Sequence, residues 1–408
     1  MKLCFLCGEY PPAAHGGIGT MVRTLGRALV GAGHEVRVVG QYADLTETVQ
    51  ETDEGVDVWR MPQPRGRLRW IQGRRTLFQR IAAWTEQGET DLVEVPDWQG
   101  WAAHWPSLSV PVVARLHGSA VYFAAEMGRH THWLTARLEA NSLRRADFWC
   151  SVSDYTARRT KSLFGLPSGP DAILPNPVNV GPPIPWEGRR QGMVVFTGTL
   201  TEKKGVVQLV DAWRRVAPLF PEATLHLVGK DGTAPGGGSM TEHLQAQLDG
   251  LAPDRVRFHG QVPHARVMEL LAEARVTVLP SLAEAFAIAP LEAMAAGCPT
   301  IASALGSGPE LIENGVDGLT VDPRQPGEIE HALCRLLADE GLAERLGHAG
   351  RRKVESRFSM AHLLTANVQF YEACIQRHAA ESGAGRVRVP VHHGGGRQSA
   401  MSAHVRDH

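Results

Sequence analysis

The sequence has no long apolar run, few cysteines and almost no net charge, and each shortage argues against a class of protein. No stretch of its 408 residues approaches the roughly eighteen apolar residues of a membrane-spanning helix, and the apolar run that begins at Leu3 stops at Gly8. We therefore expect no signal peptide and a cytoplasmic protein. The formal net charge is −1, so the overall balance does not predict a nucleic-acid partner.

The six cysteines are scattered along the chain, which does not resemble a disulfide framework and fits a reducing compartment. Cys4 and Cys7 form a Cys-x-x-Cys, but both fall in a predicted strand, where residues three apart point to opposite faces. We interpret them as small buried hydrophobic residues rather than as a redox or metal pair.

Short β-branched runs alternate with helical stretches in both halves of the chain, a rhythm typical of parallel sheets covered by helices. Ligands of such sheets bind beyond the carboxyl ends of the strands, so the site is expected there. A chain of 408 residues suits two such domains. The predicted strands span residues 2–7, 35–39, 56–59, 92–95, 110–114 and 147–152, then 193–197, 223–228, 255–259, 275–279, 299–302 and 318–321.

Five prolines between Pro175 and Pro185 mark the boundary between the halves, because proline opposes helix and favours an extended connector. Beyond about residue 380 the chain has little to bury, which predicts a disordered tail that contains His392 and His393. The expected division is a first domain over 1–178, a linker over 179–192, a second domain over 193–358, a helix over 359–380 that packs back on the first domain, and a tail over 381–408.

Two glutamates, Glu284 and Glu292, form the most informative pattern. The residues before them read as a strand, and the residues from Pro290 read as a helix with proline at its first position. Glu284 is thus predicted in a loop and Glu292 in the first helical turn. Residues 287–290 surround the helix N-terminus, whose free N–H groups and partial positive charge suit a diphosphate.

The segment from Glu284 to Glu292, Glu-Ala-Phe-Ala-Ile-Ala-Pro-Leu-Glu, resembles the Glu-Gly-Phe-Gly-x-x-x-x-Glu signature of glycosyltransferase family 4. The resemblance covers nearly all of residues 1–375 and implies the GT-B architecture, an α/β fold with two Rossmann-like domains and a cleft between them. It implies that Glu284 meets the hydroxyls of the donor sugar and that Glu292 meets the ribose. The donor site then also contains Phe286, Ala287, Ile288 and Ala289.

Two features of this segment leave alternatives open. A glycosidase also uses two carboxyl groups, about 5 to 9.5 Å apart, but eight residues of helix rise about 12 Å, which suits two contacts on one ligand better. Ala285 and Ala287 stand where the family has glycine. Either this loop avoids positive φ or the donor pocket differs slightly.

Other parts of the chain match the family one by one. Gly16 and Gly17 lie in a Gly-Gly-x-Gly turn between a strand and a helix, and the resemblance implies contact with the diphosphate or the acceptor. His117 follows a strand and corresponds to the histidine beside the reacting carbon, although a lone histidine is more often structural. Ser153 also ends a strand and is either an acceptor contact or a helix N-cap.

The run Phe196-Thr-Gly-Thr-Leu-Thr-Glu-Lys-Lys-Gly resembles the family's phosphate-binding turn. Lys204 matches the family lysine, whereas Thr199 replaces an arginine and so removes a bidentate clamp. Lys203 is interpreted as solvated. Gly229 matches a strand-ending glycine near the base or phosphates, and Glu310 matches a loop glutamate that we interpret as structural.

The sequence contains no Asp-x-Asp motif, so we expect a metal-independent reaction without a cofactor. The glycine turn lacks the lysine of a P-loop and the acidic partner of a dinucleotide fingerprint, which argues against an NTPase or a dehydrogenase. Lys204 and the helix N-terminus then stabilise the departing diphosphate.

Residues 58–85 contain no Asp or Glu but hold several arginines among tryptophans and aliphatic residues. This stretch suits an anionic membrane surface or a phosphorylated acceptor, and the alternative is an exposed helix packed through its aromatics. The arginines in question are Arg65, Arg67, Arg69, Arg74 and Arg75.

The sequence therefore predicts a retaining, hexosyl-type glycosyltransferase that moves a sugar from a nucleoside diphosphate, preferably UDP, to a hydroxyl acceptor. One rival is a noncatalytic sugar-nucleotide-binding protein, which the replacements Thr199, Ala285 and Ala287 favour slightly. Another is an epimerase or phosphorylase on the same architecture, since fold alone does not determine function.

Overall fold

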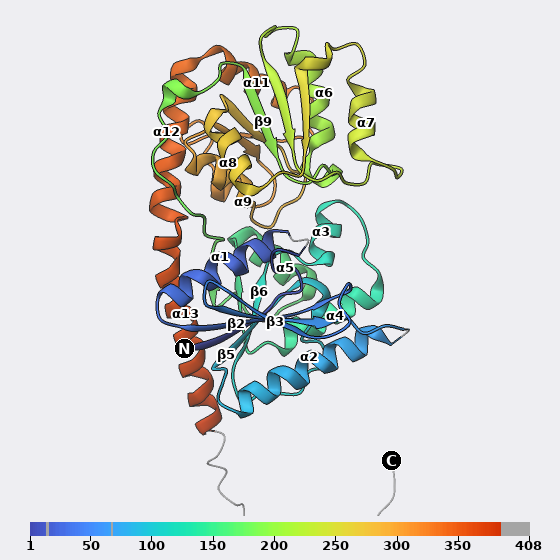
Figure 1. Ribbon diagram of the computed structural model, residues 1–408, viewed down its shortest axis with the longest axis vertical. Coiled ribbons are helices and arrows are strands. Elements are labelled where there is room, and N and C mark those ends of the chain that lie inside the picture. Colours follow the sequence, from blue (N-terminus) through green and yellow to red (C-terminus); the bar gives the residue numbers. More distant parts are fainter. Residues whose placement is uncertain (14–15, 67, 385–408) are drawn as a thin grey trace, which may run out of the picture.

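The computed structural model describes residues 1–13, 16–66 and 68–384 and contains two α/β halves placed one above the other (Figure 1). Arg67, His392 and His393 lie outside these residues. Each half is built on a mainly parallel sheet, which confirms the predicted fold class. None of the helices among the described residues combines the length and the apolar character that crossing a bilayer requires.

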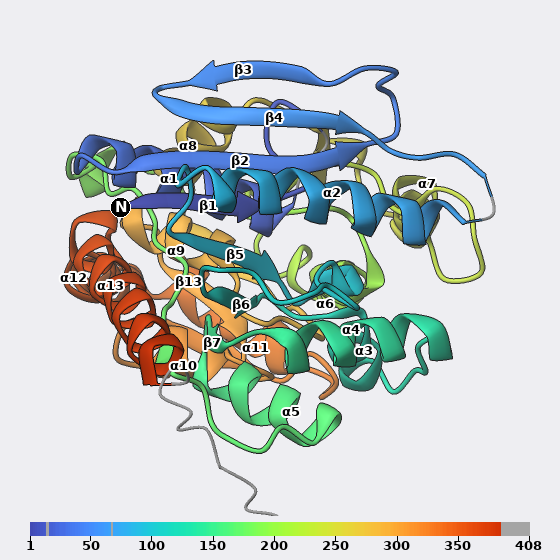
Figure 2. The same ribbon diagram turned by 90° about the horizontal axis from the view of Figure 1, so that it is seen from below.

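Within the described residues the first half contains an eight-stranded sheet, ordered β3-β4-β2-β1-β5-β6-β7-β8 and seen from below in Figure 2. Its inner strands are fully buried, as expected for a parallel sheet covered on both faces. The strands are β1 Lys2–Leu6, β2 Glu35–Tyr42, β3 Val49–Asp53, β4 Val56–Pro62, β5 Leu92–Pro96, β6 Val112–Leu116, β7 Phe148–Ser151 and β8 Ala172–Ile173. The helices are α1 Gly17–Gly31, α2 Arg69–Glu86, η1 Trp98–Gly100, α3 Ala120–Glu126, α4 Trp133–Arg145 and α5 Asp154–Phe164.

The second half contains a parallel sheet ordered β11-β10-β9-β12-β13-β14. Its strands are β9 Met193–Thr197, β10 Thr224–Val228, β11 Val256–Gly260, β12 Val276–Leu279, β13 Thr300–Ser303 and β14 Leu319–Val321. Its helices are η2 Trp186–Gly188, η3 Glu202–Lys204, α6 Val206–Val216, α7 Met240–Gln247, η4 Pro253–Arg255, α8 His264–Glu273, α9 Ile288–Ala295, α10 Gly308–Leu311, α11 Glu328–Ala338 and α12 Glu340–Arg357. The last helix, α13, spans Met360–Ala384.

Two strands have no counterpart in the predicted set. β3 pairs antiparallel with β4 at the edge of the first sheet, and its sequence, Val-Gln-Glu-Thr-Asp, is largely exposed. An edge strand of this kind needs no alternating apolar face, so its sequence carries no hydrophobic signal. β8 has only two residues, too few for a pattern to emerge.

The last two helices run along one side of both halves, and α13 returns to the first sheet (Figure 1). Phe370, Tyr371 and Cys374 of α13 are buried in the same cluster as Leu3 and Phe5 of β1. The first strand and the last helix therefore pack in the same hydrophobic core.

A buried ionic network joins α13 to this sheet. Arg115 of β6 is 1% exposed and donates two hydrogen bonds to the carboxylate of Glu94 on β5, at 2.8 and 3.0 Å. It also donates to Asn367 at 2.8 Å and to the hydroxyl of Tyr371 at 2.9 Å. The Tyr371 hydroxyl in turn donates to Glu94 at 2.8 Å. Because a buried charge is costly unless its partners are complete, each of these groups is needed.

We expect Tyr371→Phe to lower the free energy of unfolding by about 1 to 3 kcal/mol, because it leaves buried charged groups short of one partner. Urea unfolding followed by circular dichroism and tryptophan fluorescence measures the loss. Arg377→Ala is the control: it removes an α13 ion pair with Asp171 that is partly exposed, and such pairs contribute at most about 1 kcal/mol. Equal losses in the two variants would contradict this reading of the network.

Candidate active site

The loop from Ser281 to Ala287, between β12 and α9, lies against the first half of the chain. Tyr122 of α3 donates its hydroxyl to the Glu284 carbonyl at 2.8 Å. Ser153 and Thr156 donate theirs to the Ala285 carbonyl at 2.9 and 2.8 Å. Side chains of the first domain therefore hold the backbone that presents Glu284.

The carboxylate of Glu284 forms an ion pair with Lys204 and accepts a hydrogen bond from Ser281 Oγ at 3.0 Å. Its side chain is 14% exposed. Burial opposes ionisation here, but the positive charges of Lys204 and Lys203 outweigh it and hold the pKa of Glu284 below its ordinary value. The structure thus brings together the predicted sugar contact and the predicted phosphate contact as one charge pair.

The interpretation of Lys203 as a solvated side chain is wrong. Its ammonium lies over the ring of Phe123, 3.8 Å from the centroid, and burial lowers its pKa although Glu284 opposes the shift. The reason is local: residues 202–204 form a 3₁₀ turn, and the Lys203 carbonyl accepts the N–H of Leu282 at 2.8 Å. This bond draws the turn against the Glu284 loop, so both lysines are held beside it.

Gly205 makes this close approach possible. Its φ is +69°, and a Cβ atom there would lie 1.9 Å from the carbonyl oxygen of Pro280. Gly229 has φ +153°, and a Cβ on it would lie 1.9 Å from the carbonyl oxygen of Gly198. The glycine at 229 is therefore required by the packing of two strand ends, and Thr199 is exposed beside them.

Helix α9 begins at Ile288, with Ala287 as its N-cap. Pro290 is thus its third residue, not its first, and Glu292 is its fifth, in the second turn instead of the first. Ala287 has φ −77°, and the non-glycine residues with positive φ in the described chain are Glu54, Gln99 and His104. The loop therefore avoids positive φ, which answers the question raised by the two alanines.

The residues that follow Glu284 differ in what they offer a ligand. The ring of Phe286 is 6% exposed and packs on Phe358, with ring centroids 5.8 Å apart. Ala289 packs against the core of the second domain. The N–H groups of the first turn of α9 have no partner within the helix. In this segment the backbone therefore provides more hydrogen-bond donors for a ligand than the side chains do.

Glu292 is paired with a histidine. Its Oε1 lies 2.8 Å from Nε2 of His264, and this hydrogen bond raises the pKa of His264 against the effect of burial. The two residues line a cavity of about 830 Å³ between α1, the linker, α8 and α9. His264 was not among the residues singled out from the sequence, where nothing distinguishes it from a surface histidine.

The N-terminus of α1 lies close to that of α9. Gly16 is the N-cap of α1, and a Cβ on Gly17 would lie 4.0 Å from the side chain of Ile288. The Gly19 N–H donates to a carboxylate oxygen of Glu9 at 2.9 Å. Two helix N-termini with partial positive charge therefore converge, and one already holds an anionic group.

His117 follows β6 and is half-buried. Burial and the charge of Arg115 lower the pKa of His117 to about 3. Its imidazole is therefore neutral near pH 7.

Two buried carboxylates missed in the sequence hold the His117 loop. Asp97, just beyond β5, accepts the N–H groups of His117 at 2.9 Å and Gly118 at 3.1 Å. Glu139 of α4 accepts the N–H groups of Ala120 and Val121 at 3.0 and 3.1 Å. The sequence could have pointed to Asp97, because it is an acidic residue directly after a parallel strand. Glu139 lies within a helix, and nothing in the sequence marks it as part of the site.

Glu310 is structural, as interpreted from the sequence. It accepts the N–H groups of Asp154 at 2.9 Å and Tyr155 at 2.7 Å, the first two residues of α5 in the other domain. Ser153 is the N-cap of the same helix while it also donates to the Ala285 carbonyl. The N-terminus of α5 is therefore capped partly from across the cleft.

Two sequence profiles divide the chain between them. The profile “Glycosyltransferase Family 4” matches residues 15–181, and “Glycosyl transferases group 1” matches residues 187–353. The chain belongs to glycosyltransferase family 4. The prediction that it is a glycosyltransferase is confirmed, which argues against the rival readings as a noncatalytic protein, an epimerase or a phosphorylase.

Relatives match about nine-tenths of this glycosyltransferase. It is 27% identical to a glycogen synthase of Mycobacterium tuberculosis over 91% of the chain and 95% of the relative. It is 28% identical to a phosphatidyl-myo-inositol mannosyltransferase of Mycobacterium leprae over 91% of the chain and 96% of the relative. The expected transferase class is consistent with both.

Solved structures share the fold. A sucrose-phosphate synthase from Thermosynechococcus elongatus superimposes with a TM-score of 0.77 at 23% identity, covering 93% of this chain and 99% of that one. Anabaena HepE in complex with UDP and glucose gives a TM-score of 0.70 at 19% identity, covering 94% and 99%. The expected GT-B architecture is confirmed.

The arginines of the arginine-rich segment differ in their exposure to solvent. Arg65, Arg69 and Arg75 are exposed at and before the start of α2. Arg74 is half-buried and donates to the carbonyls of Trp70, Gln99 and Gly100; burial lowers its pKa to about 10. The guanidinium of Arg74 therefore donates its hydrogen bonds within the protein. We no longer include Arg74 among the arginines expected to contact a membrane or a phosphorylated acceptor.

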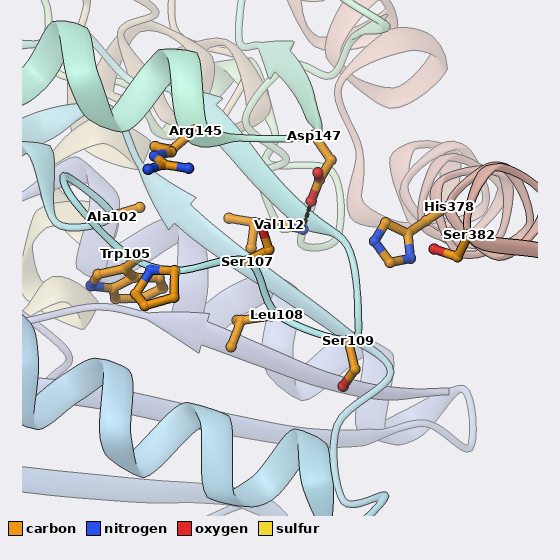
Figure 3. Close-up of a pocket in the computed structure, with 11 residues that line it drawn as sticks. Ala102, Trp105, Ser107, Leu108, Ser109, Val112, Arg145, Asp147, His378 and Ser382 are labelled. Atoms are coloured by element: carbon orange, nitrogen blue, oxygen red, sulfur yellow. Dashed lines mark hydrogen bonds between the residues drawn. The ribbon is translucent and has the colours of Figure 1, made fainter. Parts of the chain in front are cut away.

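A second cavity, of about 370 Å³, lies away from these groups, at the amino end of β6 and β7 (Figure 3). Arg145 at the end of α4 and Asp147 just before β7 border it from one stretch of the chain, and His378 borders it from α13. Asp147 accepts the Val112 N–H at 2.8 Å. None of the site residues predicted from the sequence lines it. Among the described residues, no three His, Cys, Asp or Glu side chains are grouped so that they could hold a metal ion.

We expect Asp97→Asn to change how stability depends on pH. Burial raises the pKa of Asp97 from 3.8 to about 7, although the N–H of His117 opposes the shift. The folded protein therefore keeps a proton that the unfolded chain has lost, and the stability this confers disappears as the pH rises from about 4 to about 7. Urea unfolding at several pH values should show a steeper fall for the wild type than for the variant.

The matched control is Asp147→Asn, which removes an exposed carboxylate that also accepts a backbone N–H. It should leave most of the wild-type slope in place. Parallel curves for wild type and Asp97→Asn would contradict the raised pKa of Asp97.

Proposed function

We propose that this enzyme transfers a hexosyl group from a nucleoside diphosphate sugar, with UDP as the preferred nucleotide, to a hydroxyl acceptor, with retention and without a metal ion. The observation that carries the proposal is the Lys204–Glu284 pair in the loop before α9. This loop lies against the residue that follows His117, since a Cβ on Gly118 would be 3.1 Å from the Cβ of Ala285. A cation, the carboxylate proposed to bind the sugar and a helix N-terminus are thus close together.

The donor is assigned in three parts. The diphosphate lies at the N-terminus of α9, opposite Gly16 and Gly17, where N–H groups and Lys204 supply positive charge. The sugar meets Glu284 and His117. The ribose meets Glu292, at the wall of the 830 Å³ cavity, whose size lies within the roughly 300 to 1,000 Å³ of small-molecule pockets.

The reaction breaks the bond between C1 of the sugar and the diphosphate oxygen, and the electron pair leaves with the diphosphate. Lys204 and the α9 dipole stabilise this charge as it develops. The acceptor oxygen attacks C1 from the same face, and its proton passes to the departing diphosphate oxygen. Neutral His117 orients the sugar without adding a positive charge near a cation-like carbon.

Known proteins support the donor class without identifying it. Anabaena HepE was solved with UDP and glucose, whereas the catalytic domain of a starch synthase from Arabidopsis thaliana was solved with ADP and acarbose. Both carry nucleoside diphosphates, so UDP is the first member of the test panel and ADP the second.

The exposed arginines at the start of α2 are proposed to contact an anionic membrane surface. Arg65, Arg69 and Arg75 lie beside exposed Leu68 and Ile71, so basic and apolar groups share one region. A protein that works on a membrane-bound acceptor uses such a region to stay near it.

The donor site is tested by thermal stability against UDP, ADP, GDP and their sugars, without added metal. We expect one nucleotide series to raise the melting temperature of the wild type, and Glu292→Ala to remove most of that rise because the ribose loses its carboxylate. Glu344→Ala is the control, since Glu344 also lies beside a histidine, His348, but on the exposed face of α12. No shift with any nucleotide, or an equal shift in Glu292→Ala, would count against the assignment.

The membrane contact is tested by co-sedimentation with vesicles. Wild type should bind vesicles rich in phosphatidylserine more strongly than neutral vesicles. The triple change of Arg65, Arg69 and Arg75 to glutamine should weaken binding by about a hundredfold, at about 1 kcal/mol per basic residue. The control changes Arg214, Arg335 and Arg352, exposed arginines of the second domain, to glutamine. Equal losses in both triple variants would mean that net charge alone, not this region, governs binding.

A further inference from the structure

His264 is the first residue of α8, and its side chain reaches Glu292 on α9. Its Nε2 lies 2.8 Å from Oε1 of Glu292. The imidazole is 67% exposed, whereas the glutamate is 18% exposed. The histidine is thus the more exposed partner of the pair, and the glutamate is the more buried one.

The hydrogen bond to His264 restricts the orientation of the Glu292 carboxylate. A glutamate side chain has several rotatable bonds and loses little by moving unless a partner holds it. With Oε1 bound to His264, the Glu292 side chain has fewer orientations open to it, and Oε2 keeps its capacity to accept a hydrogen bond. A carboxylate accepts more than one hydrogen bond, so the pair can still take a donor group from a ligand.

The cavity that contains the pair has few other groups to offer. Thr20 and Thr24 donate their hydroxyls to backbone carbonyls of α1 and its cap at 3.1 and 2.8 Å. Arg23 is bound to Asp53, and Arg27 is bound to Asp53 and Glu54. Met268 and Ile288 add apolar wall. A polar ligand that enters beside α9 therefore meets the His264–Glu292 pair, and the exposed side chain of Asn179 is a further polar group of the lining.

We propose that His264 is a positioning residue that holds the Glu292 carboxylate for recognition of the ribose hydroxyls of the donor nucleotide. This inference rests on the proposed function, because it needs a nucleotide to occupy the site. It adds the claim that recognition of a ribose belongs to the pair and not to Glu292 alone.

Replacing His264 could weaken ligand binding in two ways, by loss of the ribose contact or by a change in the structure of the cavity. If His264 acts through the ribose contact, its removal weakens a ligand that carries the hydroxyls and leaves unchanged a ligand that lacks them. If His264 merely supports the fold of the cavity, both ligands weaken together. A ligand change and a protein change combined in one cycle distinguish these cases.

The experiment measures Kd by titration calorimetry for the nucleoside diphosphate that stabilises the wild type and for its 2′,3′-dideoxy counterpart. For His264→Ala we expect affinity for the ribonucleotide to fall by about tenfold, the loss typical of one hydrogen-bonded group, with little change for the dideoxy ligand. His264→Gln, whose amide can also donate to Glu292, should recover much of the affinity. His348→Ala, which removes the histidine beside Glu344 on α12, should match the wild type.

Each outcome decides the inference. Equal weakening of both ligands, or unchanged affinity in His264→Ala, overturns it while the proposed function stands. Failure of the wild type to bind any nucleoside diphosphate removes the proposed function and this inference with it. Melting temperatures of the unliganded variants, measured beside the wild type, separate loss of binding from loss of folding.

Discussion

The ion pair between Arg115 and Glu94 is the interaction on which the rest of the first domain depends. Its two residues lie on neighbouring strands, β6 and β5, and each strand continues a few residues further into the site. β5 leads to Asp97 and β6 leads to His117, and the carboxylate of Asp97 accepts the N–H of His117. The same pair receives Tyr371 and Asn367 from α13. Docking of the last helix and placement of the candidate catalytic histidine are therefore set by one buried network.

A second constraint acts between the domains. The carbonyl groups of Glu284 and Ala285 accept hydrogen bonds from hydroxyls of the first domain, and Glu310 of the second domain caps α5. The geometry at Glu284 therefore depends on how the two domains sit against each other. Polar contacts of this kind are weak enough individually to be exchanged during a reaction cycle.

The charged groups assigned to the donor are already paired within the chain. Lys204 neutralises Glu284, the α1 N-terminus faces Glu9, and Glu292 is held by His264. Pairing lowers the cost of keeping charge in a partly buried cleft. A bound nucleotide sugar would share or replace these partners, so part of its binding energy is spent on rearranging the protein.

The sequence by itself determined the alternation of strands and helices, the place of the Glu284–Glu292 segment and the family that it indicates, because these depend on local periodicity and on residues close together in the chain. Local pattern does not give exact boundaries: the sequence predicts that the helix begins at Pro290, whereas α9 begins two residues earlier, at Ile288. Only the tertiary structure decided that Asp97 and Glu139 hold the His117 loop, that Lys203 is covered by Phe123, that Arg74 is engaged within the protein and that His264 reaches Glu292. Each of these contacts joins residues at least twenty positions apart or lying in different elements, and the folding of two sheets, rather than any local pattern, brings them together.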